Sequence, residues 1–262
     1  MTTLTHSYLD RTVENSIALL TINHPPGNTL TTGLLEELES TLDELAVDDN
    51  VKVVVLTGAG RFFIAGADIR ILAGIPSPQK GTEMAMSGQA IFNKIECFKK
   101  PIIAAINGAC LGGGLELAMC CHMRLAAEGA RLGQPEINLG IIPGFGGTQR
   151  LTRLIGRSIA TELILTGDSI SAQEAKALGL VSKVLPPDDL LRQAMGLARR
   201  IASKPQLAVR AGLRSIRKSE ELGLQEGLAL EASLFGELCD SEDKKEGIAA
   251  FLEKRQSHFT DR

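Results

Sequence analysis

Asn107-Gly108-Ala109-Cys110-Leu111-Gly112-Gly113-Gly114-Leu115-Glu116-Leu117 is the stretch of this sequence that most constrains the fold. It follows the apolar run 101–106, which predicts a buried strand, and continues into a short apolar helix expected over 115–121. Three consecutive glycines are costly in conformational entropy, so a fold that keeps them needs bare backbone there. The stretch therefore predicts a strand joined to a helix by a loop that something approaches closely.

The start of this helix has the chemistry of a site for negative charge. A helix N-terminus offers unpaired N–H groups and the positive end of the helix dipole, which suit a ligand oxygen that gains negative charge. Glu116 lies about one turn into the helix, so its carboxylate is expected near that oxygen. A packing loop followed by a glutamate that the dipole favours fits the same residues, and the stretch alone leaves both interpretations open.

Two other segments could also contribute backbone N–H groups or an acidic side chain to a ligand site. Ile64-Ala65-Gly66-Ala67-Asp68-Ile69 follows the short strand expected at 62–65, and its small residues leave backbone N–H groups open to a ligand, although a tight turn is the plainer interpretation. In the turn-rich segment 133–147, Glu136 lies between a proline and an apolar run. Such an acid is expected to be partly buried with a raised pKa, unless a buried salt bridge with an Arg or Lys holds it.

The rest of the chain divides into a mixed part and a helical part. Residues 7–22 predict a hairpin that turns at Glu14-Asn15-Ser16, and the leucines of 32–47 share one face of an amphipathic helix. Strands are expected at 51–56, 123–127 and 181–185, and a helix at 82–98. From about residue 148 the chain is mostly helical, with helices expected from Ser171 and over 187–203, 206–218, 222–238 and 241–256.

Composition narrows the function classes. The 262 residues are 44% hydrophobic, which is enough for one large domain, alone or with a helical appendage. The formal net charge is −3, so no excess of positive charge indicates nucleic acid or an anionic membrane. The chain has no Trp and one Tyr, which also disfavours stacking on bases. No apolar run approaches the roughly 20 residues that span a bilayer.

The five cysteines indicate a reducing compartment. Their number is odd and Cys120 and Cys121 are adjacent, which fits neither a disulfide framework nor a zinc knuckle, so reduced thiols are expected. The first fifteen residues carry acids early and lack an apolar core, which predicts neither a secretion signal nor a transit peptide. Together these features predict a cytoplasmic protein.

Several catalytic motifs are absent from the sequence. Gly144-Phe145-Gly146-Gly147 lacks the G-x-G-x-x-G spacing of a dinucleotide site, and no G-x-S-x-G elbow of a serine hydrolase occurs. The four histidines are scattered, and adjacent Cys121 and His122 do not match zinc-ligand spacing. No metal site is therefore predicted, and His122 is interpreted as a core or surface histidine.

Taken together, the glycine-rich segments resemble the crotonase superfamily, specifically the enoyl-CoA hydratases. The matching motifs occur in the family's order across nearly the whole chain: 65–69, 112–117, 133–136, 142–150, 165–168, 175–184 and 251–255. The resemblance implies an α/β fold, a crotonase-like spiral of repeated ββα units with a C-terminal helical trimerisation region. Residues 1–195 would form the spiral core and residues 196–262 the helical region, and two trimers would stack as a homohexamer.

The resemblance also implies a role for particular residues. Glu116 and Glu136 match the two catalytic glutamates of the hydratases, and the N–H groups of Ala67 and Gly113 would form an oxyanion hole for the thioester carbonyl. Gly144 would lie beside the catalytic water. The pocket for coenzyme A would be lined by the residues from 65 to 70, among them Ala65, Asp68, Ile69 and Arg70.

The implied reaction is the addition of water to a trans-2-enoyl-CoA, which gives a 3-hydroxyacyl-CoA, as in β-oxidation of fatty acids. Two carboxylates that straddle one water can act as base and acid, and they titrate as a coupled pair. We favour Glu116 as the group that activates water and Glu136 as the proton donor to the α-carbon, with no metal or redox cofactor. The bulky Phe145 would either restrict acyl length or simply pack.

Three alternatives remain at this point. The nearest is another acyl-CoA reaction on the same fold, above all double-bond isomerisation, which can work with one acid/base group. A non-catalytic CoA- or RNA-binding protein belongs to a different class, and the two glutamates and the acidic net charge argue against it. A nicotinamide-dependent dehydrogenase would need the missing dinucleotide motif.

Overall fold

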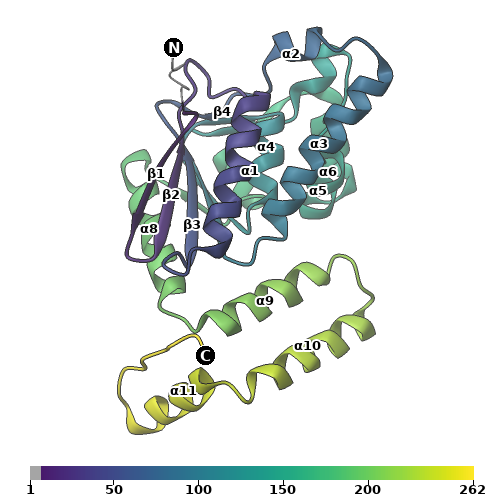
Figure 1. The fold of residues 1–262 in the computed structure, drawn as a ribbon. Coiled ribbons are helices and arrows are strands. Elements are labelled where there is room, and N and C mark those ends of the chain that lie inside the picture. The colour runs from purple at the N-terminus through teal and green to yellow at the C-terminus, as the bar shows by residue number, and fades with distance from the viewer. Residues whose placement is uncertain (1–6) are drawn as a thin grey trace.

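A six-stranded sheet forms the centre of the computed structural model, which describes residues 7–262 (Figure 1). Residues 1–6, with His6 and the start of the stretch searched for a targeting signal, lie outside the described residues. Along the sheet the order is β1 (Leu9–Glu14), β2 (Ile17–Ile22), β3 (Val53–Gly58), β5 (Ile102–Ile106), β7 (Met123–Ala127) and β10 (Lys183–Leu185). The β1–β2 hairpin is antiparallel and the remaining pairs are parallel.

A second sheet of four short strands lies beside the first. It consists of β4 (Phe62–Ile64), β6 (Ala109–Leu111), β8 (Arg131–Gly133) and β9 (Ser169–Ser171), of which only β9 runs antiparallel. Each of β3, β5 and β7 is followed by one strand of this second sheet and then by a helix. The expected repeated ββα units are thereby confirmed.

Helices cover both faces of the large sheet. Strand β3 is buried along its whole length, as parallel strands between helices are. Alternate residues of the strand join two separate apolar cores, Val54 and Leu56 in one, and Val53 and Val55 in the other. The first core includes α1 (Thr32–Val47), α3 (Pro78–Glu96) and α4 (Gly113–Cys120); the second lies under α8 (Pro187–Ala202).

Helix α1 shows why these residues form these elements. The Thr31 side chain accepts a hydrogen bond from the N–H of Leu34, which caps the helix. Its buried residues, Leu34, Leu38, Leu42 and Leu45, recur at intervals of three and four and so share one face. The helix has the bounds that the sequence predicts.

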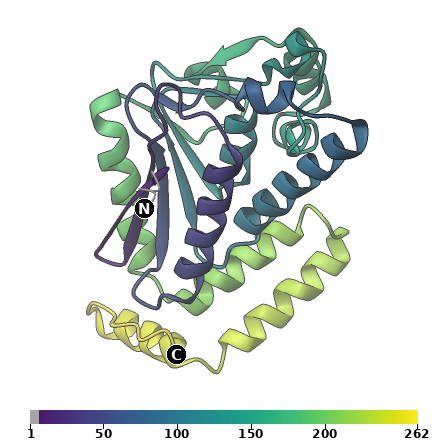
Figure 2. The same cartoon turned by 45° about the horizontal axis from the view of Figure 1, so that its top comes forward.

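The C-terminal part is helical, as expected. It contains α9 (Gln206–Lys218), α10 (Leu224–Leu238) and α11 (Glu242–Glu253), and α9 and α10 form a hairpin that extends away from the large sheet (Figures 1 and 2). These helices expose many large apolar side chains: Ile216, Leu224, Leu228, Phe235, Ile248, Phe251 and Leu252. The division after residue 195 stays a prediction, and it would fall within α8.

Several short helices complete the fold, and those after residue 147 lie where the sequence predicts helix. The stretch after Asp68 forms a short helix, α2 (Ile69–Ala73), and the region after residue 147 contains two helices, α5 (Gly147–Ile155) and α6 (Arg157–Thr166). They are separated at Gly156, whose φ of 82° ends the first helix. A further short helix is α7 (Ala172–Ala177).

All five cysteines are free, as expected. Cys97 and Cys239 are exposed, whereas Cys110, Cys120 and Cys121 are buried in the core. Among the helices of residues 7–262, none combines the length and apolar character needed to cross a bilayer.

Candidate active site

The triple glycine places Glu116 in the interior. Gly112 precedes α4 with φ 53° and ψ −128°, a conformation that favours glycine, and a Cβ there would lie 2.7 Å from Oε1 of Glu136. At Gly114 a Cβ would lie 2.6 Å from the carbonyl oxygen of Ile64. The glycines therefore let α4 start against β4 and against the second glutamate, which the sequence predicted only as a need for bare backbone.

Glu116 is 2% exposed and is held by two backbone donors. Its Oε1 accepts hydrogen bonds from the N–H of Phe145 at 2.8 Å and of Gly147 at 2.7 Å. Burial raises the pKa of Glu116 to about 7, the two N–H groups oppose this rise, and the negative charge of Glu136 adds to it. A carboxyl group with such a pKa can change protonation near neutral pH.

Glu136 lies in the first turn of the 3-10 helix η1 (Pro135–Leu139) and is half-buried. Gln134 is fully buried, and in the amide orientation that satisfies its neighbours it donates to both carboxylate oxygens of Glu136, at 3.1 and 3.0 Å. Burial raises the pKa of Glu136 to about 7. No Arg or Lys in the described part of the chain forms an ion pair with it, so the alternative of a buried salt bridge is wrong.

The N–H of Ala67 has no acceptor within residues 7–262. Ala67 pairs with Leu30 in a single parallel bridge: the N–H of Leu30 donates to Gly66, and the N–H of Asp68 donates to the carbonyl of Leu30. This bridge uses the peptide groups on either side of Ala67 and leaves its own N–H unused.

The N–H of Gly113 is likewise unused in the described residues. Its neighbour Gly112 donates to the carbonyl of Gly133 at 2.9 Å, and the first backbone bond of α4 runs from Glu116 to Gly112. Leu30 borders both residues, because its backbone pairs with Ala67 while its Cδ1 lies 2.7 Å from the Cβ position of Gly113. Oε2 of Glu116 is 3.8 Å from that same position. The sequence reasoning missed Leu30, because no local pattern around it indicates a ligand.

The segment expected to bind coenzyme A forms a loop and the start of α2. The N–H of Ala65 donates to Gly27 at 3.0 Å, and the Asp68 side chain accepts from the N–H of Arg70 and caps the helix. Arg70 also forms an ion pair with Asp68 that holds the pKa of this carboxyl below its usual value. The side chains of Ile69 and Arg70 are exposed.

Gly144 and Phe145 lie between α3 and Glu116. The carbonyl of Gly144 accepts from Nε2 of Gln89 at 2.8 Å. The Phe145 ring packs edge-to-face on Phe92, with ring centroids 5.4 Å apart, and fills the space that a side chain at Gly88 would need. Its Cδ2 also lies 3.8 Å from the Cβ position of Gly113, so the ring packs in the core and also borders Gly113.

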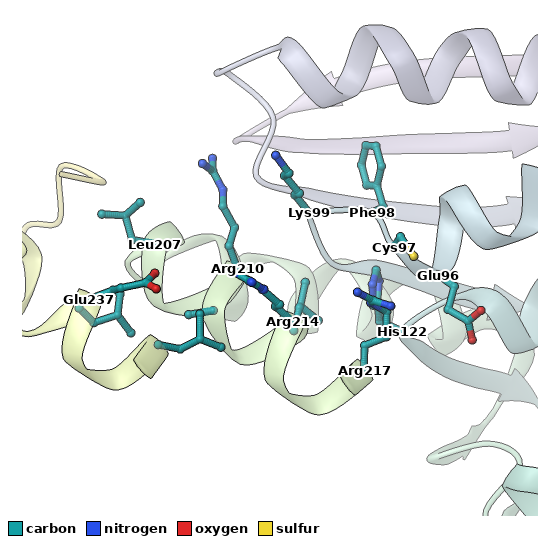
Figure 3. Close-up of a pocket in the computed structure, with 14 residues that line it drawn as sticks. Glu96, Cys97, Phe98, Lys99, His122, Leu207, Arg210, Arg214, Arg217 and Glu237 are labelled. Atoms are coloured by element: carbon teal, nitrogen blue, oxygen red, sulfur yellow. The ribbon is translucent and has the colours of Figure 1, made fainter. Parts of the chain in front are cut away.

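A pocket of about 560 Å³ lies away from these residues, between the core and the α9–α10 hairpin. Figure 3 shows the side chains that line it. Arg210, Arg214 and Arg217 reach it from α9, and none of the predicted site residues lines it. His122 also borders it; its Nδ1 accepts from the N–H of Ile102, and burial lowers its pKa to about 4. His122 is thus a partly buried histidine at the edge of the core, away from the predicted site residues. No cluster of three or more His, Cys, Asp or Glu suited to a metal ion occurs in residues 7–262.

Comparisons with known proteins agree with this geometry. The family model for enoyl-CoA hydratase/isomerase matches residues 12–262. A Bacillus subtilis protein named "Probable enoyl-CoA hydratase" is 48% identical over 94% of this chain and 96% of its own length. The crotonyl-CoA hydratase of Syntrophomonas wolfei is 44% identical over 94% and 95%. The crystal structure of enoyl-CoA hydratase from Bacillus anthracis superposes with a TM-score of 0.93 at 39% identity, covering 98% of this chain and all of that one.

Proposed function

Because this chain belongs to the enoyl-CoA hydratase/isomerase family, we propose that it adds water to a trans-2-enoyl-CoA and releases a 3-hydroxyacyl-CoA. The observation that carries the proposal is the pair Glu116 and Glu136, two carboxyl groups whose pKa values burial raises to about 7, close to free backbone N–H groups. Groups with a pKa near the working pH are suited both to accept and to donate a proton.

In the proposed reaction, the water oxygen bonds to the β-carbon while the water gives a proton to Glu116. The electrons of the double bond move toward the thioester, and the negative charge gathers on its oxygen. The N–H groups of Ala67 and Gly113 donate to that oxygen, an effect of roughly 3–4 kcal/mol per donor in well-studied cases. Glu136 gives a proton to the α-carbon, which completes the addition.

The hydrogen bonds of Glu116 support its role as the base. Two N–H donors occupy Oε1, whereas Oε2 faces the space next to Gly113 and is free to take a proton. Gly144 would lie beside the water. Both proton transfers use carboxyl groups of the chain, so the proposed reaction requires no metal and no redox cofactor.

Coenzyme A is proposed to bind at the start of α2. The segment from Ala65 to Arg70 is continuous with the free N–H of Ala67, and the exposed side chains of Ile69 and Arg70 are available for an apolar and an anionic part of the ligand. Asp68 would act through its backbone, since its side chain caps the helix.

Self-association as a trimer or a hexamer is also proposed. The apolar side chains that α9, α10 and α11 expose, among them Phe235 and Phe251 at 70% and 82% exposure, support an interface there. Sedimentation equilibrium should give three or six times the chain mass of 27.9 kDa. A mass of one chain would contradict this. The five free cysteines support a reducing compartment such as the cytoplasm.

The decisive experiment follows the loss of enone absorbance when crotonyl-CoA is added to the wild type, to Glu116→Gln and to Glu136→Gln. Loss of an acid/base group is expected to lower kcat about 10²- to 10⁴-fold in each variant. Glu128→Gln, an exposed change outside the site, should leave the rate unchanged. A folded wild type that hydrates neither short nor long enoyl-CoA, or variants that keep full activity, would refute the proposal.

A further inference from the structure

Arg150 connects three parts of the fold behind Glu116. It lies in the first turn of α5 and its side chain is 12% exposed. Nη1 donates to the carbonyl of Phe145 at 3.0 Å, Nε and Nη2 donate to Oε2 of Glu96 at 3.2 and 2.8 Å, and Nη2 also donates to Asn93 at 2.6 Å. All three guanidinium nitrogens are therefore used, and they tie the start of α5 to the end of α3.

The segment that Arg150 holds is the one that binds Glu116. The N–H of Phe145 donates to Oε1 of Glu116, and the carbonyl of the same residue accepts from Arg150. The second donor, Gly147, follows two residues later. Gly146 between them has φ 111°, and a Cβ there would collide with Nη1 of Arg150. The place of the Arg150 side chain therefore requires a glycine at position 146.

We propose that Arg150 is a positioning residue for the activation of water, which fixes residues 145–147 so that both N–H groups stay on Oε1 of Glu116 and Oε2 stays free for the proton. This inference rests on the function proposed above. Arg150 does not touch the space beside Gly113, so its effect on the reaction passes through Glu116.

The charges around Glu116 give the direction of the effect. Glu136 from η1 raises the pKa of Glu116, and Arg150 from α5 lowers it. Cys120 on the same helix is a further titratable neighbour, a buried thiol whose own pKa is raised. Loss of Arg150 would remove a positive charge and loosen two donors, and both changes favour the protonated acid. If the base stays protonated to higher pH, the low-pH limb of the rate profile moves to higher pH.

The test compares Arg150→Met and Arg150→Lys with Arg153→Met, an exposed arginine on the same helix whose Nη1 donates to Gln149. For crotonyl-CoA, Arg150→Met is expected to lower kcat at pH 7 by about 10²-fold, with KM nearly unchanged, and to move the low-pH limb to higher pH. Arg150→Lys should recover part of both effects, because lysine keeps the charge with fewer donors. Arg153→Met should behave as wild type.

A second measurement needs no turnover, so it separates this inference from the proposed reaction. Infrared titration can follow the carbonyl band of protonated Glu116, assigned as the band that Glu116→Gln lacks. The band should persist to higher pH in Arg150→Met, or in Arg150→Lys if the methionine variant does not fold. An unchanged titration and an unchanged low-pH limb would overturn the inference. A shifted titration in a protein that hydrates no enoyl-CoA would refute the proposed reaction but would still show that Arg150 holds the Glu116 carboxylate.

Discussion

Glutamine in place of Glu116 is expected to stabilise the protein at alkaline pH while it removes activity. The carboxyl group is 2% exposed, and burial raises its pKa from an ordinary 4.5 to about 7. Between these pH values the folded chain holds the proton more tightly than the unfolded chain. The free energy of unfolding therefore falls as the pH rises from about 4.5 to about 7, and it is level above that.

The two pKa values give the size of the effect. Each pH unit corresponds to about 1.36 kcal/mol, so ionisation of the buried acid costs the wild type about 3 kcal/mol by pH 8. The amide oxygen of glutamine can still accept from Phe145 and Gly147, and glutamine does not ionise. At pH 8 the variant therefore avoids the loss of unfolding free energy that ionisation of Glu116 causes. At pH 5 its unfolding free energy differs little from that of the wild type.

Circular dichroism suits this measurement because the chain has no Trp. Thermal unfolding at pH 5 and pH 8, at one protein concentration, should show the variant melting about 6–12 °C above wild type at pH 8 and close to it at pH 5. Glu128→Gln serves as the control for loss of an exposed carboxylate. If the advantage of Glu116→Gln is equal at both pH values, Glu116 is ionised in the fold without cost and the reasoning fails.

Three further predictions concern single substitutions. Gly112→Ala brings a Cβ to 2.7 Å from Oε1 of Glu136 and should lower crotonyl-CoA hydration about 10²-fold; full activity would contradict this. Phe145→Ala removes the ring beside Gly113 and should raise kcat/KM for longer enoyl chains relative to crotonyl-CoA; an unchanged ratio would assign the ring to packing alone. Arg124→Met removes a buried guanidinium that donates to the carbonyls of Cys121 and Leu180 at 2.6 and 2.8 Å; a fall of about 2–3 kcal/mol in unfolding free energy is expected, and an unchanged melting temperature would speak against it.

The elements with a strong local signal could be predicted from the sequence. Helix α1 combines a capping threonine with leucines at helical spacing, and the β1–β2 hairpin turns at Asn15-Ser16, both with positive φ. The strands β6, β8 and β9 have three residues each, too few to show a period, and they form because each pairs with a distant neighbour. Helix α3 begins at Pro78 behind a capping Ser77, a signal that was present and was missed in favour of a start at residue 82.

The candidate active site could be predicted in part from the sequence for the same reason. The glycines around Glu116 and the apolar surroundings of Glu136 are local features, and they identified both acids as candidates. Their supporting contacts come from remote segments: Leu30 beside Ala67 and Gly113, and Arg150 behind Phe145. Which N–H groups stay unpaired depends on those long-range contacts, and no single stretch of sequence records them. The roles assigned to these residues stay predictions until the variants are measured.

Because some free thiols are exposed and others are buried, thiol labelling can report the unfolding of this protein. An alkylating reagent reacts with thiolates, so the exposed Cys97 and Cys239 should be modified quickly. Burial raises the pKa of Cys121 to about 12 and that of Cys110 well above its usual value, so these thiols should react only when the core opens. Intact mass would then count two labels on a closed chain and more on an opened one. Since Cys120 lies one helical turn beyond Glu116 on α4, the later labels would time the unfolding of the element that carries the proposed base.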